Sequence, residues 1–395
     1  MKEKLGALLA LAFLATSLFG CGDSMRTNGS TSNSQNPGGS TGSGDSGGSS
    51  AANTLYVDGS SGSDSNHCQS SQSACKTIGH AISLAISGDS IIVAAATYKE
   101  NLTINVSLNI SGAGAMTTVI DGGAVGTVVT INNYDSNTHV TLSGLTIRNG
   151  SSWSGGGIRA TGVVAINNSS ILGNIGPNGA GIHNDEGTLV INSSTISGNH
   201  AGDTICLKSC NGPTQGAGIY NFSYTKQASL TLNNSTVTGN DATSSKLPSV
   251  GGAIAGTGSI SINNSTISGN SADSGGGIAA NAVIQNSIVA DNSGGNCSGT
   301  LISKGYNLSS DNTCNFTGPG DMNNTGPLLG PLQNNGGPTN TQSLLSGSPA
   351  IDADNPNGCT DGSGHLLRTD QRGKPRSDAE DTSGCDIGAY ERQSD

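Results

Sequence analysis

A nine-residue segment recurs through the middle of the chain and constrains the fold more than any other feature of the sequence. Its copies read INNSSILGN, INSSTISGN, LNNSTVTGN, INNSTISGN and, more weakly, IQNSIVADN, and they occupy residues 166–174, 191–199, 232–240, 262–270 and 284–292. Each copy follows a glycine-rich turn that ends in isoleucine, at residues 155–158, 179–182, 216–219, 251–254 and 275–278. The copies end 25, 41, 30 and 22 residues apart. An internal period near 22 to 25 residues, with occasional insertions, is typical of repeat architectures such as solenoids.

The short alternating β runs predict that each repeat forms one coil of a stack. Successive coils would lie about 4.8 Å apart, so that identical side chains align along the stack. One aligned set is aliphatic and predicts a buried column of Ile171, Ile196, Val237 and Ile267. Another set predicts an amide ladder of Asn167, Asn192, Asn233 and Asn263. The glycines would supply corners of positive φ, which other residues adopt only at a cost.

These repeats resemble the right-handed parallel β-helix (pectin-lyase-like) superfamily. The GG-x-I turns that precede I/V-x-x-N also resemble the chlamydial polymorphic outer-membrane protein repeat, with Ile or Val in place of its Phe. The resemblance implies an all-β chain: a right-handed single-stranded parallel β-helix, or solenoid, of roughly nine coils. We expect these repeats to span residues 101–325.

Composition agrees with a thin stacked core. The 395 residues include 61 glycines, only 3% aromatic and 11% charged residues, against roughly a quarter charged in an ordinary globular protein. The net charge of −11 argues against nucleic acid as a partner, because neutralising phosphates requires clustered Lys and Arg. A chain with so few aromatic residues needs many small, repeated burials.

The N-terminus predicts export and lipid anchoring. Lys2 and Lys4 precede an apolar run that is too short to span a bilayer comfortably. The run ends in Leu-Phe-Gly-Cys, which resembles a bacterial lipobox with Phe19 at a position that usually holds a small residue. The resemblance implies a signal peptide over residues 1–21, lipidation of Cys21, a membrane partner and a place in the bacterial envelope, in the outer membrane or at the cell surface. Residues 22–53 predict a disordered Gly/Ser-rich tether.

Residues 54–100 are similar to the N-terminal cap of the superfamily. Apolar residues recur there at helical spacing and predict one buried stripe, made of Ile78, Ala81, Ile82, Ala85 and Ile86. A short helix with this stripe would cover the open end of the stack, an edge otherwise prone to aggregation.

Residues 326–395 resemble the choice-of-anchor Q domain of bacterial surface proteins. The motifs are NNGGPTNTQSLLSGSPAID, DQRGKPR and CDIGAYE. We expect a C-terminal cap module that is closed by salt bridges, and the charged residues for these are Asp370, Arg372, Arg376, Asp386 and Glu391.

Eight cysteines besides Cys21 occur as near neighbours, and exported compartments permit disulfides. Eight cysteines allow 105 connectivities, so nearness alone supports the four predicted local pairs. They are Cys68–Cys75, Cys206–Cys210, Cys297–Cys314 and Cys359–Cys385. A zinc site is disfavoured because Cys206-x-x-x-Cys210 lacks a second Cys/His pair at zinc spacing.

Two insertions and a group of aromatic residues indicate a binding face. The insertions, within 200–215 and 241–250, leave the same corner of consecutive coils, and insertions in repeat proteins often build the binding surface. The candidate ligand-binding residues are Trp153, His183, Asp185, Tyr220, Phe222 and Tyr224. Half-buried aromatic packing under the loops remains an alternative. For His183 and Asp185, the competing reading is a structural position, because His183-Asn184 aligns with Tyr220-Asn221.

No catalytic pattern of the superfamily is present. The R-x-P-x-x-R of pectate lyases and the Asp-Asp and Gly-His-Gly of polygalacturonases are all missing. Asp352, Asp354 and Asp361 could supply oxygen ligands to calcium, although an acidic turn closed by Cys359 would explain them as well. We expect no other cofactor.

Three functions remain open at this point, and one of them is a purely structural role as a spacer. Another is a monomeric, non-catalytic surface lipoprotein that binds glycans or another cell-surface partner, as an adhesin or envelope component. The third is a polysaccharide lyase or glycoside hydrolase with a non-standard site.

Overall fold

The computed structural model describes residues 52–132, 138–202, 212–225, 227–356, 358–361, 364–376 and 384–393. The chain divides into two units, residues 1–50 and 51–395, and every described residue belongs to the second. The predictions for Cys21, for the tether before residue 52, and for Cys206 and Cys210 lie outside the described residues.

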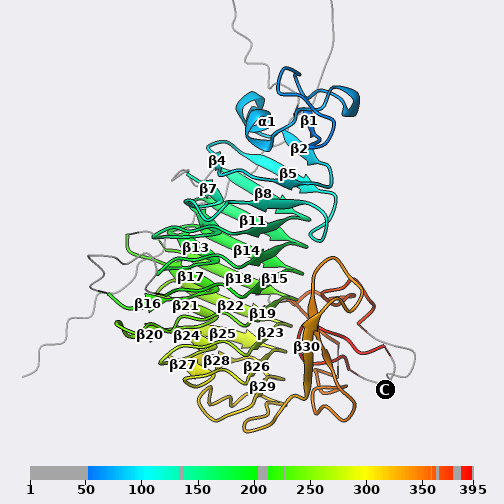
Figure 1. The fold of residues 1–395 in the computed structure, drawn as a ribbon. Coiled ribbons are helices and arrows are strands. Elements are labelled where there is room, and N and C mark those ends of the chain that lie inside the picture. Colours follow the sequence, from blue (N-terminus) through cyan, green and yellow to red (C-terminus); the bar gives the residue numbers. More distant parts are fainter. Residues whose placement is uncertain are drawn as a thin grey trace, which may run out of the picture. The chain divides into compact units, whose positions relative to one another are not determined.

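Three parallel sheets form the sides of a coil stack (Figure 1). The ten-stranded sheet contains β1 (Thr54–Val57), β2 (Ser90–Val93), β5 (Leu108–Gly112), β8 (His139–Ser143), β11 (Val163–Asn167), β14 (Thr188–Asn192), β18 (Ser229–Asn233), β22 (Ser259–Asn263), β25 (Ala282–Gln285) and β28 (Leu301–Ser303). The eight-stranded sheet contains β4 (Leu102–Ile104), β7 (Val129–Ile131), β10 (Ile158–Ala160), β13 (Ile182–Asp185), β17 (Ile219–Phe222), β21 (Ile254–Gly256), β24 (Ile278–Ala279) and β27 (Cys297–Ser298).

The nine-stranded sheet contains β3 (Thr97–Tyr98), β6 (Val119–Asp121), β9 (Thr146–Arg148), β12 (Ser170–Leu172), β15 (Thr195–Ser197), β19 (Thr236–Thr238), β23 (Thr266–Ser268), β26 (Ile288–Ala290) and β29 (Leu308–Ser309). Each strand in the repeat region pairs in parallel with the equivalent strand of the next coil. The parallel β-helix predicted from the repeats is confirmed.

The interior is a set of stacked columns, as the repeat predicts. Ile171, Ile196, Val237 and Ile267 are register partners from coil to coil and are fully buried. Because the side-chain period of a strand is two, the intervening residues face outward. This alternation leaves the outer faces of the sheets available for function.

Two asparagine ladders run along the stack, and only one was predicted. In the predicted ladder, each side-chain amide nitrogen donates to the amide oxygen of the ladder asparagine on the preceding coil. The distance is 2.9 Å from Asn192 to Asn167 and 3.0 Å from Asn233 to Asn192. The second ladder is fully buried and consists of Asn174, Asn199, Asn240, Asn270 and the less regular Asn292 and Asn296. These asparagines end the repeats, and their amides satisfy backbone groups that the coil corner leaves unpaired.

The glycine-rich turns adopt the expected left-handed backbone. Gly179, for example, has φ of 62°, and a Cβ atom there would lie 2.3 Å from the carbonyl oxygen of Ile182. Only glycine therefore fits this corner, which delivers the chain into β13.

The N-terminal cap contains a short 3-10 helix, η1 (Ser71–Ser73), and the helix α1 (Ile78–Leu84). Ile78 and Ala81 are fully buried against the first coils, as expected. The predicted stripe is wrong at its C-terminal end. The backbone becomes extended at Ala85, after the helix has ended, and Ile86 is 45% exposed. The cause is Asp89, whose carboxylate accepts the N–H of Ile86 at 2.9 Å and holds the chain outside the helix. Among the described residues, no helix has the length and apolar character to cross a membrane.

The C-terminal module (residues 326–393) lies along the outer face of the nine-stranded sheet (Figure 1). It contains an antiparallel hairpin of β30 (Leu329–Gln333) and β31 (Thr341–Leu344). Gln371 joins it to two coils, because its Oε1 accepts from Thr236 at 2.6 Å and its Nε2 donates to Thr195 at 2.9 Å. The expected cap therefore covers the side of several coils, where outward threonines offer hydrogen-bond partners.

Ion pairs close this module, as predicted. Arg372 pairs with Asp370 at 2.7 Å, and Arg376 pairs with Glu391 at 3.2 Å, with all four side chains buried. Asp386 accepts a backbone N–H at 2.9 Å. Three of the predicted disulfides are present: Cys68–Cys75, Cys297–Cys314 and Cys359–Cys385.

Candidate functional site

The outer face of the eight-stranded sheet gathers most of the predicted binding residues. The residue after each glycine-isoleucine turn points outward, and register aligns Arg159 on β10 with His183 on β13 and Tyr220 on β17. Two residues further along, Asp185 aligns with Phe222. The repeat thus converts three separate sequence segments into one continuous surface.

Four rings form what we term the aromatic face: His183, Tyr220, Phe222 and Tyr224. The ring centroids of His183 and Tyr220 are 5.1 Å apart in an edge arrangement, and those of Tyr220 and Phe222 are 5.7 Å apart. Phe222 and Tyr224 are nearly parallel at 6.4 Å, and Tyr224 is 82% exposed. Aromatic pairs at 4.5 to 7 Å stabilise one another. Tyr220 and His183 are buried, at 7% and 8% exposed, so the face presents the half-buried Phe222 and the exposed Tyr224 to solvent and packs them on the two inner rings.

His183 is the most buried polar group of the face. Its Nδ1 contacts the Ser154 hydroxyl, and its side chain lies against the two neighbouring rings. Burial lowers its pKa to about 4, with Asp185 opposing this shift and Arg159 adding to it. Among the described residues, Nε2 has no hydrogen-bond partner. His183 is therefore neutral at physiological pH, with one ring nitrogen unpaired.

The acidic residues beside His183 have structural partners. Asp185 accepts from Arg159 Nη2 at 2.7 Å. Glu186 accepts the N–H of Tyr224 at 3.2 Å and the Thr225 hydroxyl at 2.9 Å, which holds the loop that carries Tyr224. Asn184 points inward, where it donates to Asn221 at 2.7 Å. The structure therefore brings His183 and Asp185 together but gives Asp185 a cation as its direct partner.

Trp153 stands apart from the other predicted residues. It is 49% exposed and precedes Ser154, whose hydroxyl contacts His183.

The predicted loops do adjoin the face: β16 (Thr214–Gln215) pairs with β20 (Ser249–Val250), so the ends of the two insertions run side by side. A hydrogen bond from Gln215 opposes the burial that raises the pKa of Tyr220.

A hollow of about 470 Å³ lies on the next coils of the same sheet face. The register row of His183 and Tyr220 continues as Ala255, Ala279 and Ser298, so bulky side chains give way to small ones. Thr257 links the two regions, because its hydroxyl donates to the carbonyl oxygen of Ser223 at 2.9 Å. The lining residues of the hollow are small or uncharged: Val250, Gly256, Thr257, Gly258, Ala279, Ala280, Asn281, Ser298 and Gly299.

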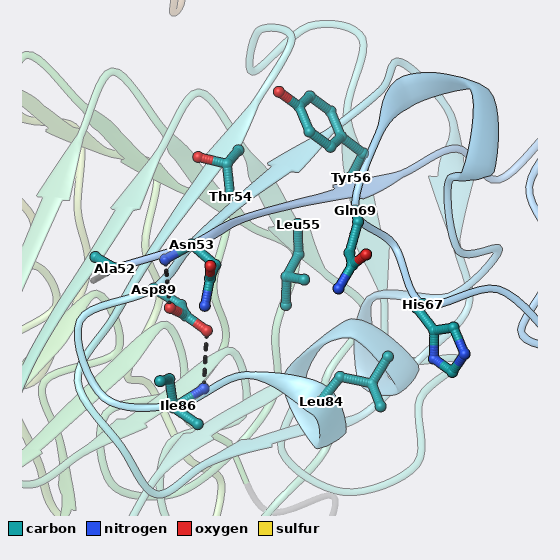
Figure 2. Close-up of a pocket in the computed structure, with 10 residues that line it drawn as sticks. All are labelled: Ala52, Asn53, Thr54, Leu55, Tyr56, His67, Gln69, Leu84, Ile86 and Asp89. Atoms are coloured by element: carbon teal, nitrogen blue, oxygen red, sulfur yellow. Dashed lines mark hydrogen bonds between the residues drawn. The ribbon is translucent and has the colours of Figure 1, made fainter. Parts of the chain in front are cut away.

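A separate cleft of about 560 Å³ lies in the N-terminal cap (Figure 2). Leu55, Leu84 and Ile86 give it an apolar wall beneath β1. Asp89 is buried at its edge, where its carboxylate accepts the N–H groups of Asn53 and Ile86. The acid therefore builds the wall of the cleft and is not displayed to a ligand.

The calcium ligands proposed from sequence do not converge. Asp354 is buried, with its Oδ2 2.6 Å from Cys359 Sγ. Asp361 accepts the N–H of His365 at 2.9 Å, and Asp352 has a left-handed backbone with φ of 52°. Within the described ranges, these three carboxylates do not form a group of mutually close oxygens. The buried disulfide, rather than a centre shared with Asp352 and Asp361, organises Asp354 here, and calcium binding by this trio stays a prediction.

Comparison with known proteins identifies no family for this chain. The sequence matches no protein-family profile and no curated protein. Among solved structures, a GH136 lacto-N-biosidase from Eubacterium ramulus is similar at a TM-score of 0.32 and 13% identity. The match covers 65% of this chain and 56% of the enzyme, so the chain spans little more than half of that protein's length.

Sequence reasoning missed two components of the site. Arg159 and Ser154 were not singled out, although Arg159 follows its Gly-Ile turn just as His183 and Tyr220 follow theirs. The hollow was missed because it is created by small side chains at Ala279 and Ser298. Aligning the residue after every Gly-Ile turn would have shown Arg159 and the change to small side chains at Ala279, whereas Ser154 precedes its turn and Ser298 follows Cys297.

Proposed function

We propose that this protein is a lipid-anchored component of the bacterial envelope that binds a glycan on the outer face of its eight-stranded sheet. The observation that carries the proposal is the series of preformed rings beside an uncharged hollow. Aromatic side chains combine a large apolar surface with fixed geometry. The apolar faces of sugar rings can pack on such surfaces while their hydroxyls reach neighbouring polar groups.

The geometry favours binding over cleavage. Glycoside hydrolysis generally needs two carboxyl groups about 5 to 9.5 Å apart on either side of the scissile bond. Next to the described aromatic face, Asp185 is paired with Arg159 and Glu186 is bonded to the 224–225 loop. Neither is placed as a free acid and base facing each other. A non-catalytic lectin-like role therefore accounts best for the site.

The first test is glycan binding by variants of the aromatic face. Replacing Phe222 and Tyr224 together by Ala should weaken binding at least about tenfold, since two stacking contacts are lost. Binding would be measured on a glycan array and then by calorimetry. Tyr224→Phe should bind nearly as tightly as the unaltered protein, because the ring remains.

Tyr56→Ala serves as the matched control because Tyr56 lines the separate N-terminal cleft. Equal affinity for the double variant and the unaltered protein would remove the aromatic face from the proposal. The same samples would be assayed for unsaturated products or new reducing ends, with and without calcium. Turnover that is abolished by His183→Ala or Asp185→Ala would replace the proposal by the lyase or hydrolase alternative.

The second test concerns the anchor. Cys21→Ser should move the protein from the membrane fraction to the soluble exported fraction, because the thiol that would carry the lipid is gone. Detection by immunoblotting and metabolic labelling with a fatty acid would check this. Retention of the variant in the membrane would contradict lipid anchoring at Cys21.

A further inference from the structure

We infer that the glycan face, meaning the aromatic face together with the neighbouring hollow, binds an uncharged oligosaccharide. The bound oligosaccharide would lie along the axis of the β-helix and cross several coils. This inference rests on the proposed function and specifies its ligand class. It follows from the order in which rings, hollow and charged groups succeed one another along the eight-stranded sheet.

The direction of the bound oligosaccharide follows from the register of the strands. The rings lie on β13 and β17 and in the loop after β17, and the hollow lies over β21, β24 and β27. Five neighbouring strands, β13 to β27, span about 19 Å at the usual strand spacing. A ligand stacked on Phe222 and Tyr224 and extended into the hollow therefore crosses coils rather than following one strand.

Charge decides the ligand class. The residues that line the hollow carry no ionised side chain. The cation of this register row, Arg159, lies three strands from β21 and is already 2.7 Å from Asp185. A uronic acid or sulfate seated in the hollow would lose water without gaining a counter-charge, which is costly.

Nearby carboxylates add repulsion to this cost. Asp185 and Glu186 lie beside the rings, and the chain carries a net charge of −11. Neutral sugars meet neither penalty. Instead, Ser298 and Asn281 offer a hydroxyl and an amide to their hydroxyl groups from the walls of the hollow.

The test compares neutral and acidic oligosaccharides of matched length on the full exported chain. Neutral gluco-, galacto-, manno- and N-acetylglucosamine oligomers should bind at least tenfold more tightly than polygalacturonate, alginate or heparin fragments. Affinity for the neutral oligomers should also rise from disaccharide to tetrasaccharide, because longer chains reach the hollow.

A charged residue substituted into the hollow provides the sharper test of ligand charge. Ala279→Lys should raise affinity for acidic fragments several-fold and lower affinity for neutral tetrasaccharides. Ala165→Lys, on the outer face of the ten-stranded sheet, is the matched control and should change neither.

The outcomes separate the two claims. Tighter binding of acidic than of neutral chains by the unaltered protein would overturn this inference while leaving the proposed glycan-binding function standing. If affinity for neutral oligosaccharides did not rise with their length, the axial arrangement of the ligand would be overturned. Binding of no glycan in either group would overturn the proposed function and this inference with it.

Discussion

At the scale of single residues, asparagine has three distinct roles within one repeat. In the repeat 232–240, Asn233 belongs to the half-buried ladder, Asn240 belongs to the buried ladder, and Asn234 occupies a left-handed corner with φ of 53°. The sequence pattern predicts the first ladder because its members stand in a β run. The second escaped prediction because its members follow glycine at the end of each repeat and resemble turn residues.

The buried ladder should matter more for stability than the half-buried one. Asn199 makes four close contacts: Nδ2 donates to Asn240 and to the carbonyl oxygen of Ile171, and Oδ1 accepts the backbone and side-chain N–H groups of Asn174. Asn199→Ala leaves these groups buried and unpaired, at a cost of about 2–5 kcal/mol. Asn192→Ala, whose ladder is half-buried, should cost about 1 kcal/mol.

Denaturant unfolding followed by circular dichroism would measure both values. Water can reach the groups left by Asn192→Ala, so that variant controls for loss of an amide as such. Equal destabilisation by the two substitutions would show that burial of the ladder does not set its contribution.

At the scale of elements, the C-terminal module is built around buried charge. Asp354, Asp370, Asp386 and Glu391 are all at least 95% buried. Ten of the 27 acidic residues lie beyond residue 350, so much of the chain's acidity belongs to this module. The sequence predicts its ion pairs from the clustering of opposite charges in two short motifs. Nothing local in the sequence indicates which face of the coils the module covers.

Asp354 should make the stability of this module depend on pH. Burial raises the pKa of its carboxyl to about 7, against hydrogen bonding by Asn355 and the charge of Arg376. Between about pH 4 and 7 the unfolded chain therefore releases a proton that the folded chain retains, so the free energy of unfolding falls as pH rises. Above pH 7 both states are ionised and this dependence ends.

Asp354→Asn removes the titration and should raise Tm at pH 8 by roughly 5 °C, with little change at pH 4. Calorimetric scans at pH 4, 6 and 8 would measure this. Asp361→Asn, at a carboxylate that accepts from His365 in a turn, is the control. A stabilisation by Asp354→Asn that is the same at pH 4 and pH 8 would contradict the assignment.

At the scale of the whole molecule, periodicity made the β-helix predictable, and the exceptions to periodicity determine the candidate site. Tyr220 and Phe222 were recognised because aromatic residues are scarce in this chain. The hollow could not be recognised in the same way, since Ala279 and Ser298 are ordinary residues whose effect depends on bulkier residues of the same row that lie two or more coils away. Disulfides within one coil or module were predictable from nearness alone, as Cys297–Cys314 shows.

The docking of the C-terminal module also limits how this protein can change in length. The described hydrogen bonds between module and coils run from Ser193 to Asn286, apart from one contact of Asn334 with Met116. A coil duplicated between Ser193 and Asn286 would shift part of the anchors by about 4.8 Å and break their match with the module. A coil duplicated between Met116 and Ser193 would keep that match. Evolutionary growth of the stack is therefore easiest in its N-terminal half, which would lengthen the proposed glycan face upstream of Tyr220 while leaving the hollow unchanged.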